Sequence, residues 1–344
     1  MRLQDALARV VQGSALSESE MAAVMERILA GNASPAQIGA FLVALRMKGE
    51  TVGELVGAAR AMRAHAVPIP GVPAEAVDTC GTGGDGASTL NVSTAAGLVV
   101  AGAGVPVAKH GNRAVSGAVG GADVLEALGV RLELPAAVLG ACLGTTGFVF
   151  LHAPALQPAM RHAAGPRREL GVRTLFNVLG PLTNPAGVRR QVIGVFDRRW
   201  VEPVAEALVR LGAERAWVVH GAGGLDEIAL EGETVVAEVA EGRVRLGTVT
   251  AADAGLAPAP LAALRVGSTA EAAALLGAVL EGTPGPARDV VCLNAAAALV
   301  VAGAARDLHE GVGLASASID SGAATRVLER VVEFTRRQAD AGAA

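Results

Sequence analysis

Four glycines fall within six residues of the segment Asp78–Thr94, which reads Asp-Thr-Cys-Gly-Thr-Gly-Gly-Asp-Gly-Ala-Ser-Thr-Leu-Asn-Val-Ser-Thr. Glycine lets a backbone take a positive φ and bring its amide N–H groups close to a ligand. Helix-compatible sequence follows, and a helix N-terminus adds unpaired N–H donors and the positive end of a dipole. The segment therefore predicts an anion cradle, most often for phosphate, with a tight turn that binds nothing as the alternative.

This loop differs from the two common nucleotide-binding loops. A P-loop needs Lys followed by Ser or Thr after its last glycine, whereas Gly86 is followed by Ala87 and Ser88. Residues 81–86 match the Gly-x-Gly-x-x-Gly pattern of dinucleotide sites, but Asp85 would repel a bare pyrophosphate unless a cation lay between them. Asp85 therefore favours a metal-bound or hydroxyl-rich ligand such as a sugar phosphate.

Two more polar segments follow apolar runs that read as strands. In Lys109-His-Gly-Asn-Arg113, the two cations can contact phosphate oxygens, with solvated surface cations as the alternative. His110, alone between a strand end and a loop, is expected to be structural. Asp226 and Glu227 repel each other unless they share a cation, and Mg²⁺ suits such oxygen ligands beside substrate phosphates. An exposed acidic turn is the other interpretation of this pair.

A predicted helix start and a predicted turn complete the set of candidate residues. Pro166-Arg167-Arg168 predicts the start of a helix. Because cations are usual at helix C-termini, two arginines at an N-terminus suggest a carboxylate or phosphate partner. Gly180-Pro-Leu-Thr-Asn-Pro185 predicts a rigid turn with an architectural role.

The elements that must position these residues fall into two domains. Residues 1–66 predict a small helical domain, with capping boxes at Ser17-x-x-Glu20 and Thr51-x-x-Glu54 and a helix start at Ser34-Pro35. The proline-rich segment 67–73 reads as a stiff linker. We expect a larger α/β domain over 74–344, with a helical segment near 165–180 joining the first domain.

Beyond the linker, short apolar runs alternate with helical stretches, which predicts an α/β fold with a mostly parallel central sheet flanked by helices. The expected strands are 75–79, 104–108, 147–151, 191–196 and 215–219, then hairpin-like strands within 228–248 and three helical blocks at 268–281, 288–305 and 321–338. Ligands of open α/β sheets bind at the carboxyl ends of strands. Segments 81–94, 109–117 and 220–227 all follow expected strands, so we expect them to form one site.

Composition excludes several other classes of function. The 344 residues are 51% hydrophobic and 2% aromatic, contain no Tyr and carry a net charge of −4, which disfavours binding to single-stranded nucleic acid or other polyanions. Three widely spaced cysteines fit a reducing cytoplasm and argue against a zinc site. We see no signal peptide, and the longest apolar run, 290–305, is short for a membrane span. We expect a cytoplasmic protein with neither nucleic-acid nor membrane partners.

These motifs together closely resemble those of the anthranilate phosphoribosyltransferases, in the same order and through nearly the whole chain. The resemblance implies transfer of the phosphoribosyl group from phosphoribosyl pyrophosphate to the amine of anthranilate. The products would be pyrophosphate and N-(5-phosphoribosyl)anthranilate, in the second step of tryptophan biosynthesis from chorismate. The resemblance also implies a helical domain beside a larger α/β domain, two Mg²⁺ ions per active site, and a homodimer formed through the helical domain.

Carried over residue by residue, the resemblance implies three sets of contacts. Those to phosphoribosyl pyrophosphate are Gly81, Gly84, Asp85, Thr89, Asn91, Val92, Ser93, Thr94, Lys109, His110, Gly111, Asn112, Arg113, Ala114, Val115, Ser116 and Gly117. Those to anthranilate are Gly81, Asn112 and Arg167, and those to Mg²⁺ are Ser93, Asp226 and Glu227. Gly121 stands where the family often has a phosphate-binding Ser, so a hydroxyl contact is lost that a backbone N–H could replace. No residue is assigned as a general acid or base.

Two other functions stay open at this point. A pyrimidine nucleoside phosphorylase shares the expected architecture and uses inorganic phosphate as its nucleophile. The Asp226-Glu227 pair and the Arg167 segment favour the transferase, because a phosphorylase has no pyrophosphate to neutralise. A non-catalytic nucleic-acid-binding member of the same fold is disfavoured by the acidic balance, the absence of Tyr and the complete set of polar site residues.

Overall fold

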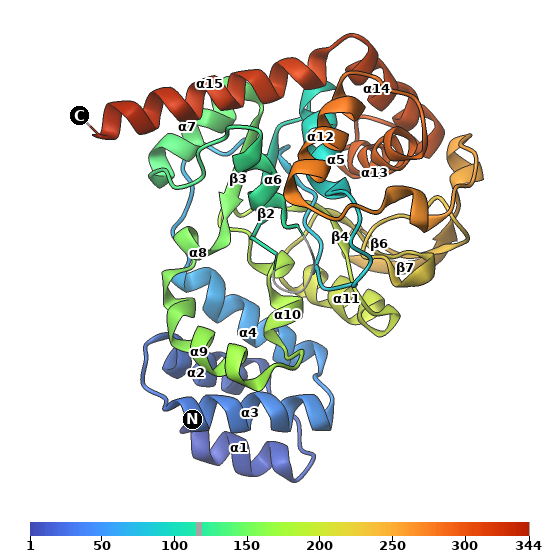
Figure 1. Cartoon of the computed structure of the whole chain (residues 1–344). Coiled ribbons are helices and arrows are strands. Elements are labelled where there is room, and N and C mark those ends of the chain that lie inside the picture. The colour runs from blue at the N-terminus through green and yellow to red at the C-terminus, as the bar shows by residue number, and fades with distance from the viewer. Residues whose placement is uncertain (115–118, 344) are drawn as a thin grey trace.

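The computed structural model describes residues 1–114 and 119–343 and contains a small helical body and a larger α/β body (Figure 1). The N-terminus lies in the helical body, and the C-terminus ends a long helix on the far side of the α/β body (Figure 1). The predicted fold class is confirmed, because a mostly parallel sheet flanked by helices forms the larger body.

The helical body is built from the first four helices, α1 (Leu3–Val11), α2 (Glu18–Leu29), α3 (Pro35–Lys48) and α4 (Val52–His65). The predicted helix starts are confirmed, since Ser17, Ser34 and Thr51 each cap a helix within a capping box. Helix α9 (Arg161–Leu170), far along the sequence, packs against α2 and α3 and completes this body (Figure 1). The chain therefore leaves the α/β body and returns to it between the third and fourth strands.

The α/β body is organised around one seven-stranded sheet of order β3-β2-β1-β4-β5-β6-β7. Its strands are β1 (Val77–Asp78), β2 (Val107–Gly111), β3 (Phe148–His152), β4 (Arg190–Gly194), β5 (Arg215–His220), β6 (Thr234–Ala240) and β7 (Arg243–Val249). Strands β1 to β5 are parallel, and β6 and β7 add an antiparallel hairpin at one edge. Because β2 and β3 lie on one side of β1 and β4 and β5 on the other, the strand order switches between β1 and β4.

The strands agree with the predicted ones except in their bounds. The expected strand 104–108 is misplaced, because β2 pairs with β3 from Val107 to Gly111. Lys109, His110 and Gly111 are therefore strand residues rather than the loop we expected. Backbone pairing continues through Lys109 and His110, whose side chains hydrogen bond to Thr79 and Ser93 and to Gly180, respectively.

Helices cover both faces of the sheet. They are α5 (Val92–Gly102), α6 (Gly121–Ala127), α7 (Ala136–Thr146), α8 (Ala153–Leu156), α10 (Phe176–Leu179), α11 (Val201–Arg210), α12 (Thr269–Leu280), α13 (Pro286–Ala302), α14 (Leu308–Asp320) and α15 (Ala323–Ala343). Short 3-10 turns lie at Pro158–Met160, Pro181–Thr183, Arg198–Trp200, Ala222–Gly224, Ala251–Ala254 and Leu261–Leu264. Three C-terminal helical blocks were predicted and four helices are present; α14 escaped prediction because its glycines and serines dilute the apolar pattern.

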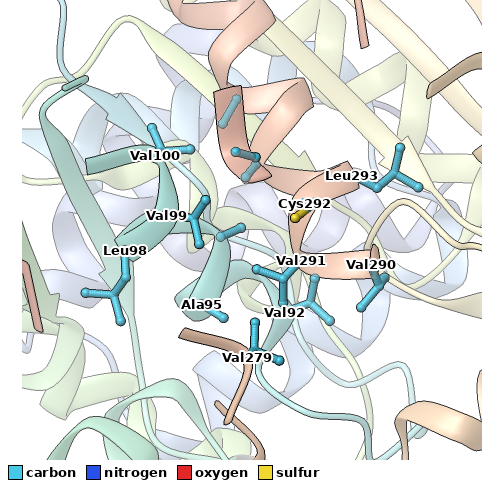
Figure 2. Close-up of a cluster of buried hydrophobic side chains, with 14 of the residues drawn as sticks. Val92, Ala95, Leu98, Val99, Val100, Val279, Val290, Val291, Cys292 and Leu293 are labelled. Atoms are coloured by element: carbon cyan, nitrogen blue, oxygen red, sulfur yellow. The ribbon is translucent and has the colours of Figure 1, made fainter. Parts of the chain in front are cut away.

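The main core lies between α5 and α13, which pack against each other (Figure 2). Every residue of α13 from Val290 to Val301 is buried, and Val92 and Val99 of α5 lie near Val291 (Figure 2). Small Ala and Val side chains allow the two helices to approach closely. None of the helices in the described ranges combines the length and the hydropathy that crossing a membrane requires.

The helix start predicted at Pro166 is wrong. Helix α9 begins five residues earlier, at Arg161, and Pro166 lies inside it. Arg167 and Arg168 therefore occupy the last turn, and the helix ends at Gly171, whose φ is 61°. Arginine is usual at a helix C-terminus, so the position of Arg167 no longer argues by itself for an anionic partner.

Candidate active site

The predicted site segments meet at the switch in strand order between β1 and β4. After β1, the Thr82 amide donates a hydrogen bond to the Gly194 carbonyl at the end of β4 (2.9 Å). A Cβ on Gly194 would lie 1.5 Å from the Asp226 carbonyl oxygen, so the loop after β5 rests directly on the end of β4. Three strands thus deliver their following loops to one place, which is where ligands of such sheets bind.

The glycine loop closes around a carboxylate of the protein itself. Gly83 takes a φ of 66°, and its N–H donates to Asp226 Oδ2 at 2.6 Å. A Cβ on Gly81 would lie 2.6 Å from the same oxygen, so this position requires glycine. Asp85 Oδ1 accepts a hydrogen bond from the Ala87 amide (3.0 Å), which turns the Asp85 side chain back into the loop.

Asp226 and Glu227 are not an exposed acidic turn. Asp226 is only 9% exposed, and Glu227 Oε1 accepts a hydrogen bond from the Ser93 amide (3.1 Å). Burial raises the pKa of Asp226, and the nearby Asp85 carboxyl raises it further. Burial and then the charge of Asp226 likewise raise the pKa of Glu227.

These carboxyl groups suit a divalent cation. Their raised pKa values mean that the protein alone disfavours their charged forms, which a bound cation would stabilise. Within residues 1–114 and 119–343, no three His, Cys, Asp or Glu side chains form a metal-binding group by themselves. Additional ligands would thus be substrate oxygens, hydroxyls or water, as is usual for Mg²⁺.

The Lys109 side chain forms hydrogen bonds both to the residue after β1 and to the start of α5. Its ammonium Nζ donates to the Thr79 carbonyl (2.7 Å) and to Ser93 Oγ (3.0 Å), and the residue is 3% exposed. Lys109 is therefore not a solvated surface cation. Its charge opposes the rise in the Glu227 pKa, so the cation and the carboxylate belong to one electrostatic unit.

The start of α5 is held by contacts other than ordinary capping. Asn91 is the N-cap residue, but its side chain caps no amide, and its Nδ2 donates to the Val119 carbonyl (3.1 Å). Ser93 instead contacts Lys109 and Glu227, which argues against a purely capping role. Thr94 is 1% exposed, and a Cβ on Gly121 would lie 2.7 Å from its Oγ1. A Ser at position 121 would require Thr94 to shift.

The backbone fixes the stretch that leads into α5. Thr89 pairs with Arg265 in an isolated antiparallel bridge, and the Leu90 amide donates to the Leu264 carbonyl (2.9 Å). Val92 is 1% exposed and belongs to the main core. Thr89 and Val92 are therefore positioned by pairing and burial respectively.

The structure does not bring the Arg113 guanidinium to Lys109. Arg113 is exposed and forms ion pairs with Asp123 (3.1 Å) and Glu126 on α6. Asn112 is also exposed, and its Oδ1 accepts a hydrogen bond from the Arg113 amide (2.7 Å). Ala114 is exposed as well, whereas Val115, Ser116 and Gly117 lie outside the described residues.

Two models of known families match the chain, in the order of its two bodies. Residues 4–66 match the "Glycosyl transferase family, helical bundle domain", and residues 73–325 match the "Glycosyl transferase family, a/b domain". The anthranilate phosphoribosyltransferase of Pelotomaculum thermopropionicum is 54% identical over 97% of this chain and 96% of its own length. The chain belongs to the anthranilate phosphoribosyltransferase family.

Solved structures of this family agree in fold. The anthranilate phosphoribosyltransferase of Thermus thermophilus superposes with a TM-score of 0.92 at 48% identity, over 96% of this chain and 99% of that one. The Saccharomyces cerevisiae anthranilate phosphoribosyltransferase, solved with phosphoribosyl pyrophosphate and Mg, gives 0.90 at 26% identity, over 97% and 98%. The family resemblance read from the sequence is confirmed, and neither the phosphorylase nor the nucleic-acid-binding alternative is supported.

Arg167, the anthranilate contact implied by the family motif, is held by an aromatic ring. Its guanidinium lies 5.1 Å from the centroid of Phe176, and burial lowers its pKa. It forms no ion pair within the described ranges, whereas Arg168 is exposed. The stacked guanidinium can therefore offer its edge to a carboxylate ligand.

Sequence reasoning gave no role to Asp78, although this residue opens the first family motif. Asp78 is fully buried; its Oδ1 accepts from the His110 amide (3.1 Å) and its Oδ2 from Asn184 Nδ2 (2.8 Å). Burial raises its pKa to about 6, and the charge of Lys109 opposes that rise. Asn184 also donates to the Ala108 carbonyl (2.8 Å), so the 180–185 turn is architectural, as expected.

His110 is a second buried member of this network. Its Nδ1 donates to the Gly180 carbonyl (3.0 Å), and the residue is 3% exposed. Its pKa is lowered to about 4, mainly by burial; the hydrogen bond to the Gly180 carbonyl opposes this change, and the neighbouring Lys109 and His152 add to it. The imidazole is therefore neutral at pH 7, in keeping with the structural role we expected.

Proposed function

We propose that this chain catalyses the Mg²⁺-dependent transfer of a phosphoribosyl group from phosphoribosyl pyrophosphate to the amine of anthranilate. The observation that carries this proposal is that Ser93 hydrogen bonds to both Lys109 and Glu227 at the switch in strand order. The glycine loop lies beside them and donates a hydrogen bond to Asp226. The same place thus holds phosphate-binding groups and a carboxylate pair suited to Mg²⁺.

Phosphoribosyl pyrophosphate is assigned to the glycine loop, the start of α5 and the end of β2. We assign its contacts to Gly81, Gly84, Asp85, Thr89, the segment 91–94 and the segment 109–117, of which residues 115–117 lie outside the described ranges. Gly121 opens α6 beside Thr94, so it can offer a backbone N–H in place of the Ser hydroxyl. The Arg113 guanidinium would have to leave Asp123 and Glu126 to reach the same ligand.

The metal ligands are assigned to Ser93, Asp226 and Glu227, with two ions per active site. The Saccharomyces cerevisiae relative was solved with both phosphoribosyl pyrophosphate and Mg, which supports a shared site for the two. When bound, Mg²⁺ neutralises the charge that develops on the departing pyrophosphate. Lys109 supplies a fixed positive charge at the same end of the site and needs no reorganisation during the reaction.

Anthranilate is assigned to Gly81, Asn112 and Arg167. The Arg167 guanidinium would hold the carboxylate and so direct the amine toward the anomeric carbon. Because an aryl amine is neutral at pH 7, no strong base is needed to make it nucleophilic. Catalysis then rests on positioning two substrates and on fixed charges, through a transition state with oxocarbenium character.

The domain boundaries and the assembly belong to the same proposal. We assign residues 1–66 to the helical domain, joined by the segment near 165–180, and residues 74–344 to the α/β domain. We assign a homodimer through the helical domain, whose interface would cover the exposed apolar side chains of Val11 on α1 (70% exposed) and Met47 on α3 (83% exposed). Sedimentation of Met47→Glu should show monomer where the wild type shows dimer, and a wild-type monomer would contradict this assignment.

The cellular location follows from the same reasoning. Cys80, Cys142 and Cys292 are all free, buried thiols, which suits a reducing compartment. We infer that the enzyme acts in the cytoplasm.

Loss of anthranilate fluorescence tests the activity directly. We expect turnover only when phosphoribosyl pyrophosphate and Mg²⁺ are both present, and no phosphorolysis of thymidine or uridine. Lys109→Met should lose most of this turnover because its charge lies inside the site, while Arg168→Ala, at an exposed position, should keep it. Nucleoside cleavage with phosphate and no consumption of anthranilate would overturn the assignment.

A further inference from the structure

Arg173 lies where the chain returns from the helical body to the α/β body. It follows Gly171 and Val172 after α9, is exposed, and precedes the buried residues Thr174 and Leu175 at the start of α10. The same connection carries Arg167 upstream and its stacking partner Phe176 downstream. Arg173 therefore lies on the same connection as Arg167, which is assigned to anthranilate.

The Arg173 side chain reaches across to the glycine loop. Its guanidinium stacks over the ring of Phe196 at 4.2 Å from the centroid, and its Nη2 donates a hydrogen bond to the Gly84 carbonyl. Phe196 is a rigid platform, since it is 8% exposed and its amide donates to Thr82 Oγ1 (3.1 Å). The planar guanidinium of Arg173 is thus held on its face by Phe196, which follows β4, and on its edge by the Gly84 carbonyl of the glycine loop.

These contacts matter because they join the glycine loop to a segment far away in the chain. Gly84 has a φ of 76°, a conformation that glycine adopts more readily than other residues, and the N–H of the neighbouring Gly83 donates to Asp226 Oδ2. A solvated surface arginine would be the default for an exposed position, but it would not combine an aromatic face with a carbonyl 89 residues away in the chain. The pair of contacts specifies where the Gly84 backbone sits.

We propose that Arg173 is a positioning residue that fixes the glycine loop against the connection between α9 and α10. The inference rests on the assignment of Gly84 and Asp85 to phosphoribosyl pyrophosphate. The loop then keeps its binding geometry only while this connection is in place. The phosphoribosyl pyrophosphate end and the anthranilate end of the site are thereby kept in a fixed relative position. Arg173 acts through Gly84, and no contact with a substrate is required of it.

Steady-state kinetics with three variants tests the proposal. Arg173→Ala should raise KM for phosphoribosyl pyrophosphate about tenfold, the loss of one charge-assisted hydrogen bond with its stacking contact, and should change KM for anthranilate less. Arg173→Lys should recover only part of the loss, because an ammonium reaches the carbonyl but lacks a planar face for Phe196. Phe196→Leu should shift the same KM in the same direction, and Arg168→Ala is the matched control that should not.

Melting temperature and calorimetric binding of phosphoribosyl pyrophosphate with Mg²⁺ separate the possible outcomes. A lower melting temperature with both KM values unchanged in Arg173→Ala would make Arg173 merely structural and overturn the proposal. Full recovery in Arg173→Lys would also overturn it, because stacking would then be irrelevant. Absence of anthranilate turnover in the wild type would instead refute the proposed function, and calorimetry would still measure the effect of Arg173 on the loop.

Discussion

Removal of the buried imidazole at His110 should change how stability depends on pH. The substitution His110→Asn keeps an N–H donor near the Gly180 carbonyl but removes the titrating group. In the folded protein burial lowers the pKa of His110 from 6.5 to about 4. Between these two values the unfolded chain binds a proton that the folded protein excludes, so acid favours unfolding.

The size of the effect follows from the two pKa values. The difference between 6.5 and about 4, at about 1.4 kcal/mol per pH unit, corresponds to roughly 3 kcal/mol at full protonation. Lowering the pH from about 7.5 to about 5 passes through most of this range. Protonation of His110 on unfolding should therefore lower the free energy of unfolding of the wild type by about 2 kcal/mol, and His110→Asn should not show this loss. The raised pKa of Asp78 acts in the opposite direction, since its stabilising contribution is lost as pH rises toward about 6, but it is present in both proteins.

Urea unfolding followed by the fluorescence of Trp200 and Trp217 measures this difference. Both tryptophans lie in or beside the sheet of the α/β body, which also contains His110. The free energy of unfolding should fall more steeply toward acid in the wild type than in His110→Asn, while the exposed His309→Asn should follow the wild type. Parallel pH profiles for the wild type and His110→Asn would show that His110 is not a buried neutral imidazole.

Three further substitutions probe the site. Arg167→Ala should raise KM for anthranilate roughly ten- to a hundredfold, from a charge-assisted bond of ~1.5–3 kcal/mol, and a larger rise for phosphoribosyl pyrophosphate would place the aromatic acid at the wrong end. Asp226→Asn with Glu227→Gln should raise the Mg²⁺ concentration needed for activity without lowering the melting temperature, because neutral amides replace carboxyl groups whose charged forms burial disfavours; normal rates at low Mg²⁺ would contradict the metal assignment. Gly81→Ala should reduce turnover at least about tenfold, since its Cβ would lie 2.6 Å from Asp226 Oδ2, and unchanged kinetics would show that the loop can shift freely.

Signals within one turn or one short run of residues were predictable from the sequence. The capping side chains Ser17 and Thr51 act on amides three residues away, so their function does not depend on the rest of the fold. The alternation of apolar runs and helices likewise predicted a parallel sheet, because burial on both faces imposes that pattern. The ordered motifs around Asp78, Lys109 and Asp226 were enough to indicate the family.

The bounds of the helices and strands and the burial of the site side chains were less predictable, since they depend on contacts with distant parts of the chain. Strand β2 continues through Lys109 because β3 pairs with it. Helix α9 begins at Arg161, before Pro166, where it packs against α2 and α3 of the helical body. Burial of Asp226 depends on Gly194, which leaves room for its backbone, and no local pattern encodes that contact. An acidic turn and a metal site have the same residue types, and only burial distinguishes them.

The sequence by itself therefore determined which kinds of groups the site contains, and the tertiary structure decided how those groups are used. Local composition specifies turns, caps and charges, because these act over a few bonds or within a single helical turn. The neutral state of His110 and the contact of Arg173 with Gly84 each depend on residues far away in the chain, and the pairing of Arg113 with α6 depends on where the fold places that helix. Desolvation and pairing arise only once the chain has folded, so they decide the charge and the direction of each side chain.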